Sequence, residues 1–335
     1  MKRKQRVIPF LYKIIAGAAV LVLCFIAAML FGAADTTLQD LWLALSSDAS
    51  SNTILALREI RMPRELAAML TGAALAVSGA IMQGVTRNPL ADPGLLGLSS
   101  GANMAVALVF VFLPGLNNFG IMVACFFGAA LGATLVFILS SAGKGRLSPI
   151  RVVLAGSAVS AFLYAVSEGI SIAFKISKDV SMWTAGGLIG TTWGQLQTIA
   201  PVIIVGGVAA VVLSNQVTIL SLSDDVAKGL GQRLALIKTV LFVLVVLLTG
   251  ASVALVGNIA FVGLMIPHIV RMIAGTDYRY IMPLSVFAGA SFMLLADTLG
   301  RTINAPNETP VAAIIALLGL PFFLLVVRKG GKALS

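Results

Sequence analysis

Long apolar runs alternate with short polar segments along the whole chain. A helix needs about 20 mostly apolar residues to cross the hydrocarbon core of a bilayer, and ten runs reach or approach that length. The predicted membrane spans are residues 10–31, 65–82, 96–114, 119–141, 152–174, 195–213, 238–257, 259–275, 281–300 and 310–327. The seventh span ends at Gly257 and only Asn258 separates it from the eighth, which contains Pro267. The pattern predicts an all-α polytopic membrane protein with about ten transmembrane helices.

Composition supports the same class. Hydrophobic residues make up 59% of the chain, charged residues 11%, and the mean hydropathy is +1.02, which exceeds what a soluble domain of 335 residues can bury. The first apolar run follows basic residues as in a signal peptide, but "FGAAD" is a poor cleavage site, so we expect a retained helix. We therefore expect one transmembrane domain over residues 1–335.

Basic residues predict the orientation, because cytoplasmic loops are enriched in Lys and Arg. With the N-terminus inside, only six of the 23 basic residues lie on the outer face, and 23 minus 6 leaves 17 on the cytoplasmic face. The six are Arg58, Arg61, Arg64, Lys175, Lys178 and Arg301. Both termini are then cytoplasmic. This distribution accounts for the net charge of +10, so no nucleic-acid partner is expected.

Few residues suggest chemistry on this chain. The two cysteines, Cys24 and Cys125, lie within predicted spans, and the single histidine, His268, has no Cys or His at ligand spacing. The chain also lacks the GxxxxGK[ST] phosphate-binding loop. We expect no catalytic residues, no metal site and no cofactor on this chain, and any ATP and Mg²⁺ would bind another subunit.

Two features concern organisation. "GAALAVSGAI" from Gly72 resembles "GASVALVGNI" from Gly250, an offset of 250 minus 72, or 178 residues. The echo relates spans five apart and therefore of opposite orientation, as in an inverted-topology repeat, although chance similarity of small residues is the alternative. The stretch "RNPLADPGLLGLSSGA", residues 87–102, predicts a structured cytoplasmic turn whose glycines allow close backbone approach.

Four segments together resemble the FecCD-type permease family, the membrane subunits of ABC importers for ferric siderophores, haem or vitamin B12. They are "RMPRELAAMLTGAALAVSGAIMQGVTRNPLADPGLLGLSSGA" (61–102), "GNIAFVGLMIPHIVRMIAGTDYR" (257–279), "FAGASFMLLADTLGR" (287–301) and "PVAAIIALLGLPFFLLVV" (310–327). The resemblance implies that residues 1–335 form a single permease domain of an importer in the bacterial cytoplasmic membrane. The expected substrate is a ferric siderophore, with vitamin B12 or haem as the alternative. It also implies a second permease subunit, either a homologue or a second copy, two cytoplasmic ATPase subunits and an extracytoplasmic substrate-binding protein.

The resemblance assigns roles to individual residues. Residues 221–238 would form the cytoplasmic coupling loop for the ATPase, with a solvated loop as the alternative. The matching positions are Asp224, Asp225, Ala227, Gly229, Leu230 and Gly231. Arg61, Arg64 and Arg301 would receive carboxylates of the binding protein, since the planar guanidinium group holds a carboxylate through two hydrogen bonds. The alternative for Arg64 is a pair with Glu65 or Asp297 within the chain.

Two further residues are expected near the mouth of the pathway. Glu168 lies about 25 Å along its helix from Arg151, close to the outer end of the fifth span. Trp183 follows that span and either anchors the chain at the membrane interface or touches substrate. An ion-coupled secondary transporter is the alternative of a different class. It would use buried acids as ion sites, for which Glu168 and Asp297 are the candidates.

Overall fold

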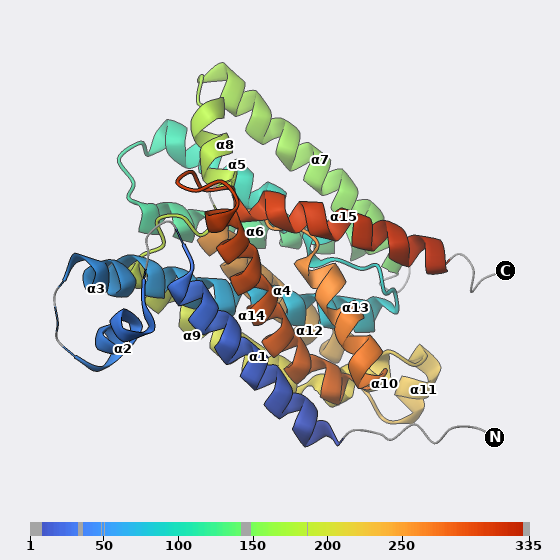
Figure 1. Cartoon of the computed structure of the whole chain (residues 1–335). Helices are drawn as coiled ribbons and strands as arrows, with labels where there is room; N and C mark the ends of the chain where they lie inside the picture. The colour runs from blue at the N-terminus through green and yellow to red at the C-terminus, as the bar shows by residue number, and fades with distance from the viewer. Residues whose placement is uncertain are drawn as a thin grey trace.

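The computed structural model describes residues 9–32, 36–47, 49, 51–141, 149–185 and 187–330, and every regular element among them is helical. The basic residues Lys2, Arg3, Lys4, Arg6, Lys144, Arg146 and Lys332 of the predicted topology lie outside these ranges. The helices, shown in Figure 1, are α1 (Phe10–Leu30), α2 (Leu38–Ser46), α3 (Asn52–Ala56), η1 (Leu57–Arg61), α4 (Met62–Thr86), η2 (Pro93–Leu96), α5 (Leu98–Phe112), α6 (Asn118–Ser141), α7 (Pro149–Ala173), α8 (Ser177–Ala185), α9 (Trp193–Val212), α10 (Ser214–Leu220), α11 (Asp224–Gly229), α12 (Leu234–Val256), α13 (Val262–Ala274), α14 (Tyr278–Thr302) and α15 (Val311–Gly330).

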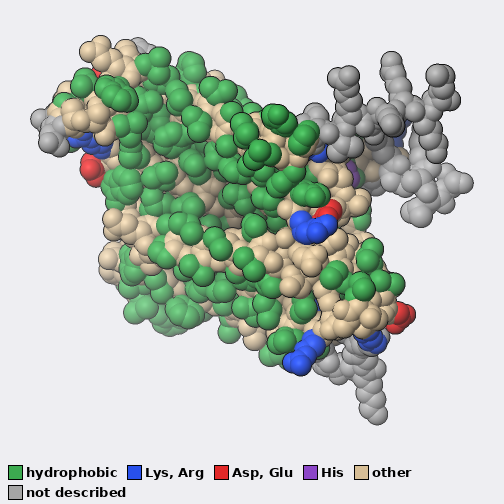
Figure 2. Space-filling model, turned by 90° about the horizontal axis from the view of Figure 1, so that it is seen from below, with side chains coloured by type: hydrophobic (Ala, Val, Ile, Leu, Met, Phe, Trp, Pro, Cys, Tyr) green, Lys and Arg blue, Asp and Glu red, His purple; other side chains and the backbone are tan. Residues whose placement is uncertain are grey.

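Seven helices in the described part of the chain are long and apolar enough to cross a membrane. They are Phe10–Leu30, Asn52–Thr86, Asn118–Ser140, Arg151–Ala173, Trp193–Val212, Leu234–Val256 and Tyr278–Thr302. The other three predicted spans coincide with the shorter apolar helices Leu98–Phe112, Val262–Ala274 and Val311–Val326. Hydrophobic side chains cover most of the face in Figure 2, as expected for a surface in contact with lipid.

The second predicted span is longer than the sequence indicates. A continuous helix runs from Asn52 through α3, η1 and α4 to Thr86, whereas the apolar run begins only at residue 65. Arg58, Arg61 and Arg64 therefore lie on helix and not in a loop that precedes it. Hydropathy missed this first part of the helix because its arginines lower the local hydropathy, although Arg58 has backbone acceptors around α2 and Arg64 pairs with Asp297.

Helix α4 defines the two ends of the molecule, which we call the Arg64 end, where it begins, and the Arg87 end, where it stops. Helix α12 is antiparallel to α4, because Lys238 near its start and Arg87 both bind Asp224. Helix α14 finishes at the Arg64 end, where Arg301 lies close to Glu65. Figure 1 shows both ends of the described chain on the same side of the molecule.

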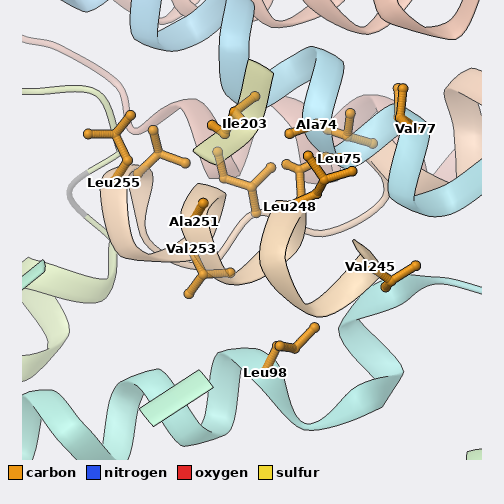
Figure 3. Packing of buried hydrophobic residues seen from close by; sticks show 14 of the residues in the cluster. Ala74, Leu75, Val77, Leu98, Ile203, Val245, Leu248, Ala251, Val253 and Leu255 are labelled. Carbon is orange, nitrogen blue, oxygen red and sulfur yellow. The ribbon is translucent and has the colours of Figure 1, made fainter. Parts of the chain in front are cut away.

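Helices α4 and α12 carry the two similar stretches that begin at Gly72 and Gly250. They contact each other, and α4 also packs along α14 while α12 packs along α6. Helix α6 starts near the end of α12, since Asn118 and Gly257 line one cavity, so it runs opposite to α14. Figure 3 shows side chains of α4, α5 and α9 gathered around α12 at the centre of the core.

The turn predicted over residues 87–102 is present and structured. Arg87 adopts the left-handed conformation with φ 53°, the Asp92 carboxylate accepts a hydrogen bond from the Gly94 N–H at 2.7 Å, and η2 follows. A Cβ atom on Gly101 would lie 2.1 Å from the carbonyl oxygen of Gly128, so only glycine allows α5 to approach α6 this closely. The turn thereby joins α4 to the next hairpin of helices.

Candidate functional site

Helix α11 lies within residues 221–238, the predicted coupling loop, and is capped at both ends by neighbouring residues. The Ser223 hydroxyl accepts a hydrogen bond from the Val226 N–H at 3.2 Å and caps the N-terminus. At the C-terminus, Gly231 has φ +79° and the Gln232 N–H donates to the Ala227 carbonyl oxygen at 3.0 Å, which is a Schellman motif. Gly231 therefore ends the helix because its backbone conformation favours glycine.

Asp224 joins α11 to the body of the protein. Its carboxylate accepts hydrogen bonds from Lys238 Nζ, at 3.2 Å to each oxygen, and from the Arg87 guanidinium group. Arg87 Nε also donates to the Leu220 carbonyl oxygen at 2.9 Å, at the end of α10. Partial burial acts to raise the pKa of Asp224, but the hydrogen bonds from Arg87 and Lys238 outweigh it and hold the pKa below its usual value.

The structure separates the six predicted coupling residues into two groups. Asp224 and the fully buried Ala227 face the protein, whereas Asp225, Gly229, Leu230 and Gly231 are exposed. Leu230 is 62% exposed, and Val226, one helical turn earlier, is 47% exposed. With Leu222, which is 53% exposed, they make an apolar surface that we call the α11 patch. Apolar side chains displayed on a charged, capped helix are suited to docking another protein.

The three arginines expected to dock a partner have partners inside the chain. Arg301 Nε donates to Asp297 at 2.9 Å, its Nη2 donates to Glu65 at 2.5 Å, and its side chain is 5% exposed. Arg64 donates to Asp297 at 2.8 Å and to Glu308 at 2.9 Å. We call Arg64, Glu65, Asp297 and Arg301 the Asp297 cluster.

Arg61 and Arg301 also close the end of α1. Arg61 Nη1 donates to the Met29 carbonyl oxygen at 2.6 Å and to Thr36 Oγ1 at 2.9 Å, and Arg301 Nη2 donates to the Ala28 carbonyl oxygen at 3.0 Å. Positive charge at a helix C-terminus complements the carbonyl groups that lack helical partners. Of the intramolecular partners considered for Arg64, the structure shows Asp297, while Glu65 pairs with Arg301. Docking by Arg61, Arg64 and Arg301 stays a prediction.

Arg58 is a structural residue that the sequence did not identify. Its guanidinium group donates to the carbonyl oxygens of Leu43, Ala44, Ser47 and Ala49, around the C-terminus of α2. The Arg58 carbonyl oxygen in turn accepts from Trp193 Nε1 at 3.0 Å, which ties the start of α9 to the same region. The sequence pattern around Arg58 does not predict that it caps the C-terminus of α2, because a turn between two short helices separates Arg58 from its acceptors.

Trp183 and Glu168 occupy different surroundings. Trp183 is half-buried and lines a cavity of about 430 Å³ at the Arg64 end, between α8, the turn at 187–191, the start of α9 and the end of α12. Glu168 is exposed on α7, five residues before the helix ends, and does not line that cavity. Among the described residues, no group of three His, Cys, Asp or Glu side chains could hold a metal ion.

Comparison with known families identifies the chain. The model of the FecCD transport family matches residues 20–329. The chain belongs to this family. It is 44% identical over 324 residues to the iron(3+)-hydroxamate import system permease protein FhuB of Bacillus subtilis (strain 168), covering 96% of this chain and 84% of that protein. It is 43% identical over 273 residues to the iron-uptake system permease protein FeuB of the same organism, covering 81% and 82%.

A solved structure shares the fold. The protein described as "an inward-facing conformation of a putative metal-chelate type ABC transporter" matches with a TM-score of 0.82 at 26% identity, over 94% of this chain and 98% of that one. Family membership and seven apolar helices place the FecCD chain in the bacterial cytoplasmic membrane as a multi-pass transport permease, which confirms the predicted class and location.

Proposed function

We propose that this FecCD chain is the permease subunit of an ABC importer that moves a ferric siderophore into the cytoplasm. The main support is the 44% sequence identity to an iron(3+)-hydroxamate permease across 96% of the chain. The chelate crosses intact, so the permease needs no metal ligands of its own. ATP and Mg²⁺ bind a separate ATPase subunit, and this chain catalyses no reaction.

The proposed orientation places the Arg87 end in the cytoplasm and the Arg64 end outside. Basic residues support it, because Lys228, Arg233 and Lys238 lie in or next to α11 and Arg279 lies at the start of α14. We count ten transmembrane helices by including α5, α13 and α15. The opposite directions of α4 and α12 support two inverted halves.

The ATPase subunits dock on the α11 patch. A short capped helix whose apolar side chains are exposed fits a cleft on a partner and moves with it as a rigid element. Closure of the ATPase dimer would then push α11 and, through it, the transmembrane helices. Two permease subunits, this chain with a copy or a homologue, enclose the pathway between them.

The substrate-binding protein docks at the Arg64 end. Glu308 is the most exposed partner of Arg64, with 29% of its side chain accessible, so an incoming carboxylate can replace it without opening the buried Arg301–Glu65 pair. Arg61, Arg64 and Arg301 would all attract carboxylates of that protein. Trp183 and Glu168 lie toward this end and would border the mouth through which the chelate enters.

Uptake measurements test the proposed substrate. Cells that lack this gene are offered radiolabelled iron as a ferric trihydroxamate, as ferric enterobactin, as ferric citrate and as haem, with labelled cobalamin alongside. Loss of uptake of one ferric siderophore, restored by the gene, supports the proposal. If only haem uptake or only cobalamin uptake is lost, then haem or cobalamin is the substrate and the ferric-siderophore assignment is wrong. Uptake that depends on the proton gradient and is unchanged when the ATPase is removed would favour a secondary transporter.

A further inference from the structure

The backbone at Arg87 is unusual for its residue type. Arg87 follows α4 in the left-handed conformation, with φ 53° and ψ 30°, a position that glycine normally occupies at the end of a helix. Residues with a Cβ atom are disfavoured there because the side chain crowds the backbone. An arginine in this place points to a requirement for the side chain itself.

The Arg87 side chain reaches across the turn that precedes α11. Nε donates to the carbonyl oxygen of Leu220, the last residue of α10, and Nη2 donates to Asp224, the first residue of α11. One planar guanidinium group thus holds both ends of the 221–223 turn, a geometry that a lysine ammonium group does not reproduce. The side chain is 35% exposed and lies beside the surface proposed to meet the ATPase.

Asp224 is shared by the two central helices of the fold. Arg87 binds it from the end of α4, and Lys238 binds it from the start of α12. Helices α4 and α12 contact each other, and they pack along α14 and α6, respectively. A displacement of α11 therefore acts on both α4 and α12 through the Asp224 carboxylate.

Helix α4 is packed so that it transmits a displacement. A Cβ atom on Gly72 would lie 2.3 Å from the Gly289 carbonyl oxygen, and one on Gly79 would lie 1.8 Å from the Gly263 carbonyl oxygen. Backbone contacts of this kind leave no flexible side chains to absorb movement between α4, α13 and α14. The far end of α4 carries Arg64 and Glu65 of the Asp297 cluster.

We propose that Arg87 is a positioning residue that links the coupling helix α11 to α4, so that movement at the ATPase reaches the Arg64 end. The inference rests on the proposed docking of an ATPase at α11. It assigns a role to a residue outside the coupling segment itself. Arg87 holds α11 in place and contacts neither ATP nor substrate.

The test uses the complete complex in proteoliposomes, with permease pair, ATPase subunits and binding protein. Arg87→Gly removes the side chain but suits the left-handed backbone, so folding is preserved. Arg87→Lys keeps the positive charge but loses the planar guanidinium group that binds Leu220 and Asp224 at the same time. Arg279→Ala is the matched control, because Arg279 forms an exposed pair with Asp277 at the same end but does not touch α11. Stimulation of ATP hydrolysis by the binding protein is the first readout, and import of a radiolabelled ferric trihydroxamate per ATP hydrolysed is the second.

We expect Arg87→Gly to assemble with the ATPase and to melt close to the parent. Stimulation should fall at least about tenfold, because the charge-assisted hydrogen bonds from Arg87 to Leu220 and Asp224 are both lost. Arg87→Lys should recover part of the stimulation, and Arg279→Ala should match the parent. Combining Arg87→Gly with Asp224→Asn should cost no more than the stronger single change, because both remove the same contact.

Unchanged stimulation in Arg87→Gly would overturn the proposal. Loss of the ATPase from the Arg87→Gly complex would also overturn it, because Arg87 would then form the docking surface and transmit nothing. Failure of the proposed substrate is seen separately. A parent complex that shows stimulated ATP hydrolysis but imports no ferric trihydroxamate contradicts the substrate assignment and leaves the stimulation readout for Arg87 intact.

Discussion

Gly79 and Gly263 cross in direct backbone contact, such that a Cβ atom on Gly79 would stand 1.8 Å from the Gly263 carbonyl oxygen. Helices α4 and α13 can meet this closely only because neither residue has a side chain. Gly79→Ala should lower the stability of the protein by about 3 kcal/mol, toward the upper part of the range for overpacked cores. Thermal unfolding in detergent measures the change.

Gly207→Ala is the control for that substitution. Gly207 lies within α9, and a Cβ atom added to it would meet open space, with no neighbouring atom within 4 Å. Stability should stay the same or rise by up to about 1 kcal/mol, because alanine is the better helix former. Equal losses for the two variants would contradict the close contact.

Asp297 should be far more important for stability than Glu308, although both bind Arg64. Asp297 is 1% exposed and also binds Arg301, so Asp297→Asn leaves two guanidinium groups short of negative charge. We expect a loss of about 3 to 5 kcal/mol. Glu308 is 29% exposed, and Glu308→Gln should cost less than about 1 kcal/mol. Melting temperatures of the two variants, compared in the same detergent, decide between this ranking and its reverse.

Arg58→Ala should loosen α2 without unfolding the bundle. The guanidinium group is the donor to four carbonyl oxygens around the end of that helix, and its loss should cost about 1 to 2 kcal/mol locally. Hydrogen exchange over residues 38–46 should accelerate, while exchange in α12 stays slow. Arg58→Lys should recover only part of the protection, and uniform acceleration in both helices would argue against a local role.

Leu230→Glu should abolish docking of the ATPase while the permease still folds. Leu230 is 62% exposed in the α11 patch, and a carboxylate there would be desolvated on docking. The amount of ATPase that copurifies should fall at least about tenfold. Leu113→Glu introduces the same change at a leucine that is 56% exposed after α5, beyond the reach of α11, and should leave copurification intact.

The Asp224 link should resist acid. Because hydrogen bonds from Arg87 and Lys238 lower the pKa of Asp224 below its usual value of about 3.9, the link is complete above that value and is lost only as the pH falls through the lowered one. Stimulated ATP hydrolysis should therefore show no Asp224-dependent decline between about pH 5 and 8. An acidic decline in this range that Asp224→Asn removes would contradict the assignment.

The sequence predicted the membrane-spanning helices, whose length and apolar character are determined by the bilayer. The runs at 10–31, 119–141 and 281–300 became helices Phe10–Leu30, Asn118–Ser141 and Tyr278–Thr302, because a membrane sets both the length and the apolar character of a span. The start of the helix at Asn52 was missed because Arg58, Arg61 and Arg64 look like loop charges. Their acceptors include the end of α1 and Asp297, and such distant partners leave no local pattern.

The candidate site was predicted unevenly for the same reason. The proposed coupling segment was chosen from a motif and stays a prediction, whereas its helix, cap and terminating glycine are local features of residues 223–232. Sequence could not show that Asp224 faces inward toward Arg87 and Lys238 while Leu230 faces outward. That division depends on the positions of Arg87 and Lys238, which are 137 and 14 residues away from Asp224 in the sequence.

The helix that carries Arg58, Arg61 and Arg64 also poses a problem during synthesis. In the proposed orientation these cations must cross the membrane before Asp297, which lies 233 residues after Arg64, has been synthesised to receive that arginine. Glu59 and Glu65 lie within the same stretch, but acidic residues contribute little to the orientation of a span, so they do not remove the cost of exporting the arginines. In the proposed orientation, this segment is therefore exported before the finished fold supplies all the partners of its arginines.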